Sequence, residues 1–476
     1  MESVGRMRLW IRKIWNGKAR QFARNNGAPV VAFSATLALL LFNLAEGAWL
    51  SDESYYMMTG QGYAQFLLNP NREILTRHVL SYLHTPSDEA AGLVNHPFLA
   101  KLVIGVSLLI SGSKVPNNFL KPTPTQLFWG RLPSTLIASL SMFVIYYLVY
   151  SRFGAISATL AGVFLISDAT FLQYSRLAML DVYAATFMIA SFGVLISSSS
   201  LEWKQLCASA LLAGLMVASK FTPGVFASLL VMLSVVFNRR GLKGLFFYLA
   251  IGMVLFLIVD FYYLFLSPLY LFNAFLGAGR PVPQEIGVSH GAADPFHAMF
   301  SWGAYYSISH TWSVVEVALV VLSLVLAAFL MIKRTCDNTE IDVLFLANIT
   351  LGFVSFSWER PLVLLAPVTA LFISTTIARF IREFVPARWA LLIQGGAIIA
   401  LLIQLAAIVR EAYFSNSLFM YYASVYIPAT LLLPPLTVAG EIVLVLVAVF
   451  AGALAISLLR RSRYYLKHLS QLDFLD

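Results

Sequence analysis

The stretch PVVAFSATLALLLFNLAEGAWL, residues 29–50, is followed at once by SDESYY, residues 51–56. The first stretch is long enough to cross the hydrocarbon core of a bilayer as a helix, which takes about 20 residues. Lipid offers the backbone no hydrogen bonds, and the run does not alternate with polar residues, so a helix is predicted rather than a barrel strand. Similar runs recur as far as Leu459. The chain is therefore predicted to be an all-α polytopic membrane protein.

The composition excludes an ordinary soluble domain. The chain has 476 residues, of which 59% are hydrophobic and 12% are charged, whereas about 25% of the residues in a soluble domain are charged. The net charge of +9 does not indicate nucleic-acid binding, because the basic residues lie mostly at the ends of the apolar runs. They are concentrated before the first run, which predicts a cytoplasmic N-terminus by the positive-inside rule.

Hydropathy and the positions of Lys and Arg together predict about twelve transmembrane helices, within a range of about 11–13. The predicted spans are 29–49, 131–150, 154–173, 178–198, 205–219, 223–237, 244–266, 313–332, 341–357, 361–379, 388–409 and 439–459. The apolar stretch 97–112 is interpreted as an interfacial or re-entrant helix, because a full crossing there would place the later basic turns outside.

The predicted organisation is one transmembrane domain, residues 29–459, between a basic cytoplasmic arm, residues 1–28, and a cytoplasmic tail, residues 460–476. Residues 50–130 are expected to form the first extracytoplasmic loop and to contain amphipathic helices that lie in the membrane interface. Residues 267–312 are expected to form the second.

Ionisable residues gather near the predicted outer ends of several helices. A charge at membrane depth costs a few kcal/mol and is usually paired or functional. The group consists of Asp52, Glu53, His96, Lys101, Arg131, Asp168, Arg176, Asp181, Lys220, Glu359 and Arg360. A cavity with carboxylates and several cations suits an anionic lipid-linked substrate, because the cations would hold its phosphate while a carboxylate moves a proton.

If the leaving group is a lipid phosphate, the reaction needs fewer catalytic groups. A phosphate with a second pKa of about 6 departs without a general acid, so one carboxylate base is enough. Asp52 would take the proton from an acceptor hydroxyl. A single displacement of this kind inverts the anomeric carbon, by analogy with inverting glycosidases.

Five short motifs resemble those of bacterial and archaeal protein O-mannosyltransferases, membrane enzymes of the GT-C class that use a polyprenyl-phosphate sugar. DESYY, residues 52–56, resembles the family's Asp-Glu-x-Tyr-Tyr, and NHPFLAK, residues 95–101, resembles His-Pro-Pro-Leu-x-Lys. WGRLPS, residues 129–134, is similar to its Arg-x-Pro-Ser helix start. SRLAMLD, residues 175–181, is similar to Ser-Arg-x-x-x-Leu-Asp, and ASK, residues 218–220, to Gly-Ser-Lys. The five occur in the family's order.

The resemblance implies a GT-C-type fold and a role for each matching residue. The implied catalytic residues are Asp52, as the base, and Glu53 beside it, for the acceptor or for structure. The implied donor-phosphate ligands are Arg131, Lys220, Arg360 and Arg176, and the implied substrate or entrance residues are His96, Lys101, Tyr55, Asp181 and His297. No metal-ligand spacing is present; Glu53 and His96 are the candidates for a divalent cation.

The predicted activity is thus an inverting transfer of a hexose, expected to be mannose, from a polyprenyl or dolichyl phosphate to a hydroxyl, favoured as protein Ser or Thr. The predicted partners are membrane lipid, this donor and the acceptor, with no nucleic acid. The site is expected on the extracytoplasmic face of the plasma membrane. Alternatives are a lipid or polysaccharide acceptor, as in aminoarabinose transferases, a secondary transporter, and a protein that only binds lipid phosphate.

Several of these residues also have a purely structural interpretation. Asp52 and Glu53 suit a helix N-terminus, and Arg176 and Asp181 suit an ion pair across a turn. Basic residues at the outer ends of the spans suit contacts with lipid headgroups. Asp260, inside a predicted span, suits either a hydrogen bond between helices or a lipid groove.

Overall fold

The computed structural model describes residues 27–46, 51–69, 97–113, 122–197, 200–220, 222–260, 314–333, 339–354, 362–414, 443 and 445–456. Every regular element in these residues is a helix, which confirms the all-α prediction. The labelled helices are α2 (Ser51–Leu68), α5 (Leu99–Ile110), α6 (Pro124–Phe153), α7 (Ala155–Ser167), α8 (Ala169–Ser175), α9 (Asp181–Ile196), α10 (Trp203–Ser219), α11 (Pro223–Val259), α16 (Val314–Ile332), α17 (Thr339–Val354), α18 (Leu362–Phe384) and α19 (Ala387–Phe414). Two further helices cover Gly27–Leu41 and Val445–Ile456.

Five of the described helices, within α6, α11, α16, α18 and α19, are long and apolar enough to cross a membrane. The number becomes six if α7 and α8, which are bent by 70° at their junction, form one broken span. Shorter apolar helices include α5, α9 and α10. The described residues therefore confirm a polytopic membrane fold, while the count of about twelve crossings stays a prediction.

Capping residues set several helix ends. Thr123 and Gln126 form a capping box at the start of α6, with Pro124 in the first turn, which satisfies backbone N–H groups that have no partner inside the helix. Gly154 ends α6 with φ +83°, a conformation that glycine adopts without steric cost. Asp168 caps α8 through Phe171 N at 2.8 Å, so the predicted span 154–173 is broken there.

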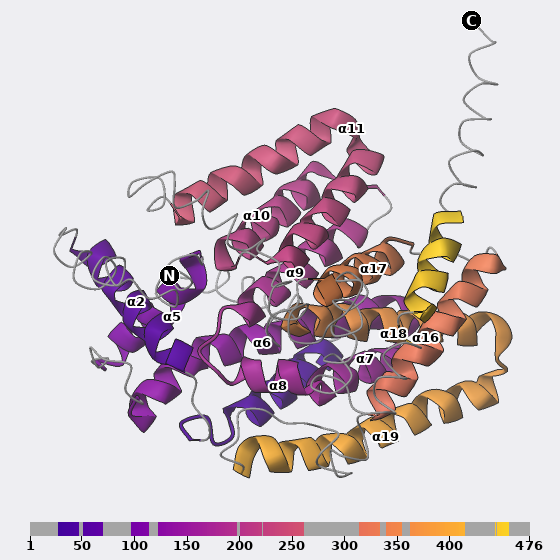
Figure 1. Ribbon diagram of the computed structural model, residues 1–476, viewed down its shortest axis with the longest axis horizontal. Coiled ribbons are helices and arrows are strands. Elements are labelled where there is room, and N and C mark those ends of the chain that lie inside the picture. The colour runs from indigo at the N-terminus through magenta and orange to yellow at the C-terminus, as the bar shows by residue number, and fades with distance from the viewer. Residues whose placement is uncertain are drawn as a thin grey trace, which may run out of the picture.

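The long helix α11 consists of two helices joined at a corner. Gly241 interrupts it with φ +63° and ψ −165°. The Tyr248 hydroxyl donates to Met232 Sδ at 3.6 Å although 16 residues separate them; a straight helix would hold them about 24 Å apart. The chain therefore doubles back at Gly241, between the predicted spans 223–237 and 244–266. The second half of α11 runs along the upper edge of the molecule (Figure 1).

The helices α2 and α5 cross at two glycines and lie together on the left in Figure 1. A Cβ on Gly60 would lie 2.0 Å from the Lys101 carbonyl oxygen, and one on Gly105 would lie 1.9 Å from the Gly60 oxygen. The two backbones are thus in direct contact. With 12 residues, α5 is about 18 Å long, shorter than the hydrocarbon core of about 30 Å, as the prediction of an interfacial or re-entrant helix requires.

The centre of the molecule is α18, which packs against α6, α7, α9, α16 and α17. In its most apolar stretch 94% of the residues are buried, against 17% in α11 and 22% in α19. The rings of Phe345 in α17 and Phe372 in α18 stack at 3.9 Å. The helices α11 and α19 therefore lie at the periphery, with most of their apolar side chains facing outward.

Candidate active site

Glu53 lies in the first turn of α2 and forms a buried two-point ion pair with Arg131 of α6. Its two oxygens accept from Arg131 Nε and Nη2, each at 2.8 Å. The Arg131 and Glu53 side chains are 2% and 0% exposed. Arg131 Nη1 also donates to the carbonyls of Leu44 and Glu46, and Ala178 N donates to Glu53 at 2.9 Å. One ion pair thus joins the segment before α2, α2 itself, α6 and the turn before α9.

Arg176 holds the same segment from the other side. Its Nη2 donates to the carbonyls of Phe42 and Asn43 at 2.9 and 3.0 Å. The first helix was predicted to continue to residue 49, but it ends at Leu41, and Asn43 has φ +53°. Asparagine is one of the few residues that tolerate this conformation. The carbonyls exposed where the helix ends are thus bound by a buried arginine.

Asp52, the predicted base, belongs to the first turn of α2, but its side chain lies outside the described residues. The same holds for all of His96, His297 and Arg360. Neighbouring residues of a helix project about 100° apart around its axis. The contacts of Glu53 therefore do not fix where Asp52 points, and the structure describes only the side chain of Glu53.

Lys220 and Asp181 form a second buried ion pair, between the ends of α10 and α9. The other carboxylate oxygen of Asp181 is buried without a hydrogen-bond partner among the described residues. The alternative in which Arg176 pairs with Asp181 is not what the structure shows, because Asp181 binds Lys220. Arg176 instead holds the backbone before α2.

Lys101 lies in the first turn of α5 and is buried among aromatic rings. Its Nζ is 5.0 Å from the ring centre of Phe98 and 5.9 Å from those of Tyr55 and Tyr56. Burial lowers the pKa of Lys101 to about 7, and the Asp260 carboxylate nearby opposes this. Asp260, at the end of α11, accepts from Phe98 N at 2.7 Å. Of its two predicted roles, the structure therefore shows the hydrogen bond between elements.

Two buried carboxyl groups, those of Asp168 and Glu316, lie near each other. Asp168 at the break between α7 and α8 and Glu316 in the first turn of α16 are both buried and close enough for their charges to interact. Sequence reasoning singled out Asp168 but missed Glu316. A glutamate within the apolar run VVEVALVV, residues 314–321, was the available signal.

The described candidate residues come together around α2 and the turn that joins α8 to α9. Glu53 and Tyr55 lie on α2, with Arg131, Lys101 and Arg176 in contact with it or with the segment before it. No group of three or more potential metal ligands occurs in the part of the chain that the structure describes. Arg131 engages both oxygens of Glu53, so this carboxylate is arranged to bind a guanidinium.

The fold is similar to that of known glycosyltransferases. Archaeal oligosaccharyltransferase AglB from Archaeoglobus fulgidus, solved with an inhibitory peptide and a dolichol-phosphate, has a TM-score of 0.51 at 13% identity, over 85% of this chain and 56% of that one. An Archaeoglobus fulgidus oligosaccharyltransferase complex with Zn and sulfate has a TM-score of 0.50 at 14% identity, over 80% and 53%. ArnT from Cupriavidus metallidurans bound to undecaprenyl phosphate has a TM-score of 0.48 at 13% identity, over 90% and 78%. This chain thus spans little more than half the length of the oligosaccharyltransferases.

The fold and the apolar helices define an integral membrane protein with a GT-C-type fold. Within that class, residues 123–263 match the family described as dolichyl-phosphate-mannose-protein mannosyltransferase. The predicted resemblance to protein O-mannosyltransferases is thereby confirmed over this segment, which contains Arg131, Arg176, Asp181 and Lys220. No curated protein matches the chain.

Proposed function

We propose that this protein is an inverting glycosyltransferase that moves a hexose, mannose in the first instance, from a polyprenyl or dolichyl phosphate to a hydroxyl of a protein Ser or Thr. One observation carries the proposal. The segment that matches the mannosyltransferase family, residues 123–263, supplies Arg131 and Ala178, which fix the first turn of α2 through Glu53. That turn contains the Asp-Glu motif to which the resemblance assigns the base.

Asp52 is the base in this proposal. It takes the proton of the acceptor hydroxyl while the hydroxyl oxygen forms a bond to the anomeric carbon. The bond from that carbon to the lipid-phosphate oxygen breaks, and its electron pair leaves with the phosphate, so the configuration inverts. A carboxyl group in the first turn of a helix is favoured in its ionised form by the positive end of the helix dipole, which is the form that a base requires.

Glu53 is a positioning residue. Its side chain is fully buried, and its oxygens are engaged by Arg131 and Ala178 N. Charge-assisted two-point pairs of this kind fix both distance and orientation. Glu53 therefore holds the start of α2 and, with it, the backbone of Asp52.

Three basic side chains of the described cluster, Arg131, Arg176 and Lys220, bind the donor phosphate in this proposal, together with Arg360, which lies outside the described residues. Lys220 is paired with the Asp181 carboxylate, so a phosphate there would share or replace that carboxylate. Lys101 Nζ lies 5.9 Å from the ring centre of Tyr55 on α2, and both residues are assigned to the substrate entrance with Asp181, His96 and His297.

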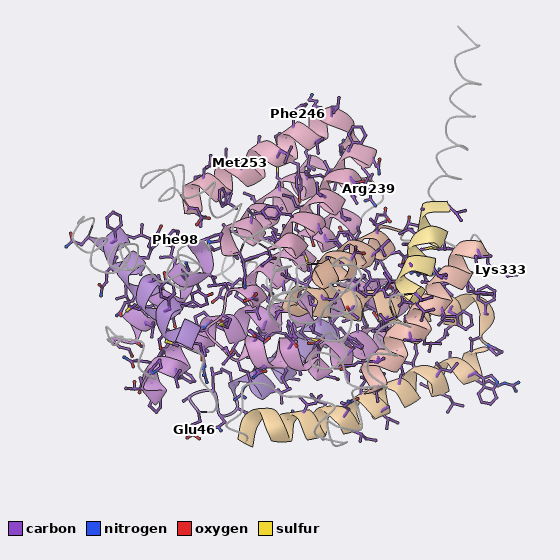
Figure 2. The ribbon with its side chains drawn as sticks, viewed as in Figure 1. Glu46, Phe98, Arg239, Phe246, Met253 and Lys333 are labelled. Atoms are coloured by element: carbon purple, nitrogen blue, oxygen red, sulfur yellow. The ribbon has the colours of Figure 1, made fainter. Side chains whose placement is uncertain are left out.

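The protein is proposed to work in the plasma membrane with its site on the extracytoplasmic face. Figure 2 shows Phe98 and Glu46 on one side of the molecule and Arg239 and Lys333 on the opposite side. Basic turns at the end opposite the candidate site agree with a cytoplasmic location for those turns.

The test supplies radiolabelled dolichyl-phosphate mannose to the purified protein together with Ser/Thr-containing peptides and with lipid acceptors. We expect label on the peptide hydroxyls. Label on the lipid alone would replace the proposed acceptor with a lipid while keeping the reaction. If the label stays on the donor with every acceptor, the proposed transfer is overturned. Parallel assays with EDTA and with added divalent ions test the cation that GT-C relatives suggest.

A further inference from the structure

A basic and aromatic patch lies where α11 turns back on itself, far from the candidate active site. It is formed by Trp203, Lys204, Arg240, Lys243 and Phe247, and is called the α11 corner below. The guanidinium carbon of Arg240 lies 5.4 Å from the centre of the Trp203 ring. That ring meets Phe247 edge to face at 5.0 Å. Trp203 is 42% exposed, and both lysines are exposed.

Glycines build the corner. Gly241 has φ +63°, so the chain reverses between Arg240 and Lys243 and leaves both on the turn. A Cβ on Gly244 would lie 2.3 Å from Arg240 Cβ. Only glycine therefore allows the second half of α11 to begin so close to Arg240, which brings this arginine over Trp203.

The two lysines of the corner are exposed and Arg240 is half-buried, whereas the adjacent Arg239 is bound to other helices. Arg239 donates to the Leu195 carbonyl at 2.7 Å and to Glu340 at 3.0 Å, so it serves to join helices. On the corner, the nearby acid is Glu202, whose side chain caps the start of α10. Three basic groups thus face one carboxylate, which leaves the patch positive.

Exposed apolar side chains adjoin these charges. Leu242 is 61% exposed and Phe246 is 68% exposed, and they continue into the outward face of the second half of α11, where Met253 and Val254 are also exposed. Tryptophan beside basic residues, at the end of an apolar face, is the pattern of a membrane–water interface. In a protein whose helices cross a membrane, the corner is therefore placed at headgroup depth.

We propose that the α11 corner binds the headgroup of an anionic phospholipid. Lys and Arg attract anionic lipid headgroups, and an arginine guanidinium binds phosphate in a two-point geometry. Arg240, held over Trp203, gives the patch a fixed donor group, while Lys204 and Lys243 add charge around it. The acyl chains would lie along Phe246 and the exposed face beyond it.

This site is separate from the proposed transfer reaction. In Figure 2, Phe246 and Arg239 mark the corner end of the molecule, and Phe98 and Glu46 mark the end with the candidate active site. None of the corner residues belongs to the cluster around α2. Lipid binding at the corner is therefore measurable whether or not the protein transfers sugar.

The test titrates purified protein in detergent with dioleoyl phosphatidylglycerol and, separately, with dioleoyl phosphatidylcholine, and counts bound lipids by native mass spectrometry. We expect tighter binding of phosphatidylglycerol. The double variant R240Q/K243Q should bind it roughly tenfold more weakly, and binding of phosphatidylcholine should not change. W203A should weaken phosphatidylglycerol binding a few fold, since Arg240 loses the ring that orients it.

The matched control is K333Q/R382Q, which removes two exposed basic groups from other helix ends and changes the net charge equally. We expect this control to bind phosphatidylglycerol like the parent protein. Equal weakening by both double variants would overturn the proposal, because binding would then reflect overall charge. Equal affinity of the parent for the two lipids would overturn it as well. Thermal unfolding of each variant checks that it is folded.

Discussion

Two buried arginine–carboxylate pairs in this protein have the same chemistry but different surroundings. Glu53 with Arg131 and Asp342 with Arg379 are both two-point pairs, and their side chains are at most 2% exposed. The two arginines differ in where their remaining N–H groups donate. Arg131 donates to carbonyls of the segment before α2, and Glu53 accepts from Ala178 N. The first pair therefore joins four parts of the chain.

The pair of Asp342 and Arg379 is local by comparison. Arg379 uses its other donors on its own helix, at the Thr375 carbonyl and the Thr376 hydroxyl. Among the described residues, this pair connects α17 to α18. Both pairs cost desolvation. Among the contacts of the described residues, those of the first pair reach a non-helical segment, residues 44–46, next to the Asp-Glu motif, and those of the second stay within two helices. The difference indicates that the first pair positions a site and the second pins two helices.

The largest effect is expected from D52N. The amide cannot accept the hydroxyl proton, so turnover should fall by about 10²–10⁴-fold, while binding of dolichyl-phosphate mannose persists. Single-turnover transfer and donor binding should be measured on the same preparation. D342N is the control, because it makes the same Asp-to-Asn change at the buried pair with Arg379, outside the proposed site. Near-normal turnover of D52N would exclude Asp52 as the base.

The second effect tests whether α5 must touch α2. In G60A the new methyl group would overlap the Lys101 carbonyl, so the two helices must separate. A displacement of about 1 Å in an active site costs roughly 10²-fold in rate, and we expect a loss of that order in turnover per folded molecule.

The control for G60A is G214A, which introduces a methyl group 2.7 Å from the Gly252 carbonyl at the crossing of α10 and α11. It should lower thermal stability while keeping turnover in the folded fraction. If G214A lost as much turnover as G60A, close helix contact in general, rather than the α2–α5 crossing, would explain the loss.

The sequence predicts where helices occur far better than which side chains pair between them. Apolar runs are local, so α6, α10 and the doubling back near Gly241 follow from the sequence. The predicted start of α6 was wrong, because the helix begins at Pro124 rather than at residue 131, and Pro133 lies inside it. The pairing of side chains between helices does not follow from the sequence. Glu53 and Arg131 are 78 residues apart, and nothing local tells which of several basic residues meets which carboxylate. The sequence marks the residues of the cluster by their cost in a membrane, but their pairing depends on how the helices pack.

The direct backbone contact between α2 and α5 could not be predicted from the sequence either. The sequence gives no sign that Gly60 and Gly105 face each other, because the contact depends on the crossing angle of two helices. The early end of the first helix at Leu41 has a similar origin. Its apolar pattern continues beyond that residue, but Asn43 turns and Arg176 binds the freed carbonyls. A tertiary contact here overrides local hydropathy.

The third prediction compares the two ion pairs directly through E53Q and D342N. Removing one charge from a buried pair costs about 3–5 kcal/mol, so both variants should unfold at lower temperature. E53Q should also lose about tenfold in turnover per folded molecule, because the first turn of α2 is no longer held by the ion pair. D342N should not. Thermal unfolding and turnover, measured together, separate the two roles. Equal loss of turnover in both variants would remove the distinction between the pairs.

The smallest effect is expected from D260N, because its amide oxygen still accepts the hydrogen bond from Phe98 N. Burial raises the pKa of Asp260 to about 8, so near pH 7 the change removes only part of a charge. The Asp260 carboxylate raises the pKa of Lys101, which burial lowers to about 7. Without that carboxylate the pKa of Lys101 falls further, and the ammonium loses its proton at a lower pH. If a protonated Lys101 assists the entry of the anionic donor, the alkaline limit of kcat/KM should move to lower pH, with a few-fold loss at and above pH ~7 and little change only at pH values below the lowered pKa. A pH profile that does not move would show that the charge of Lys101 plays no part in donor capture, and would leave Asp260 with the same structural task as Asp342.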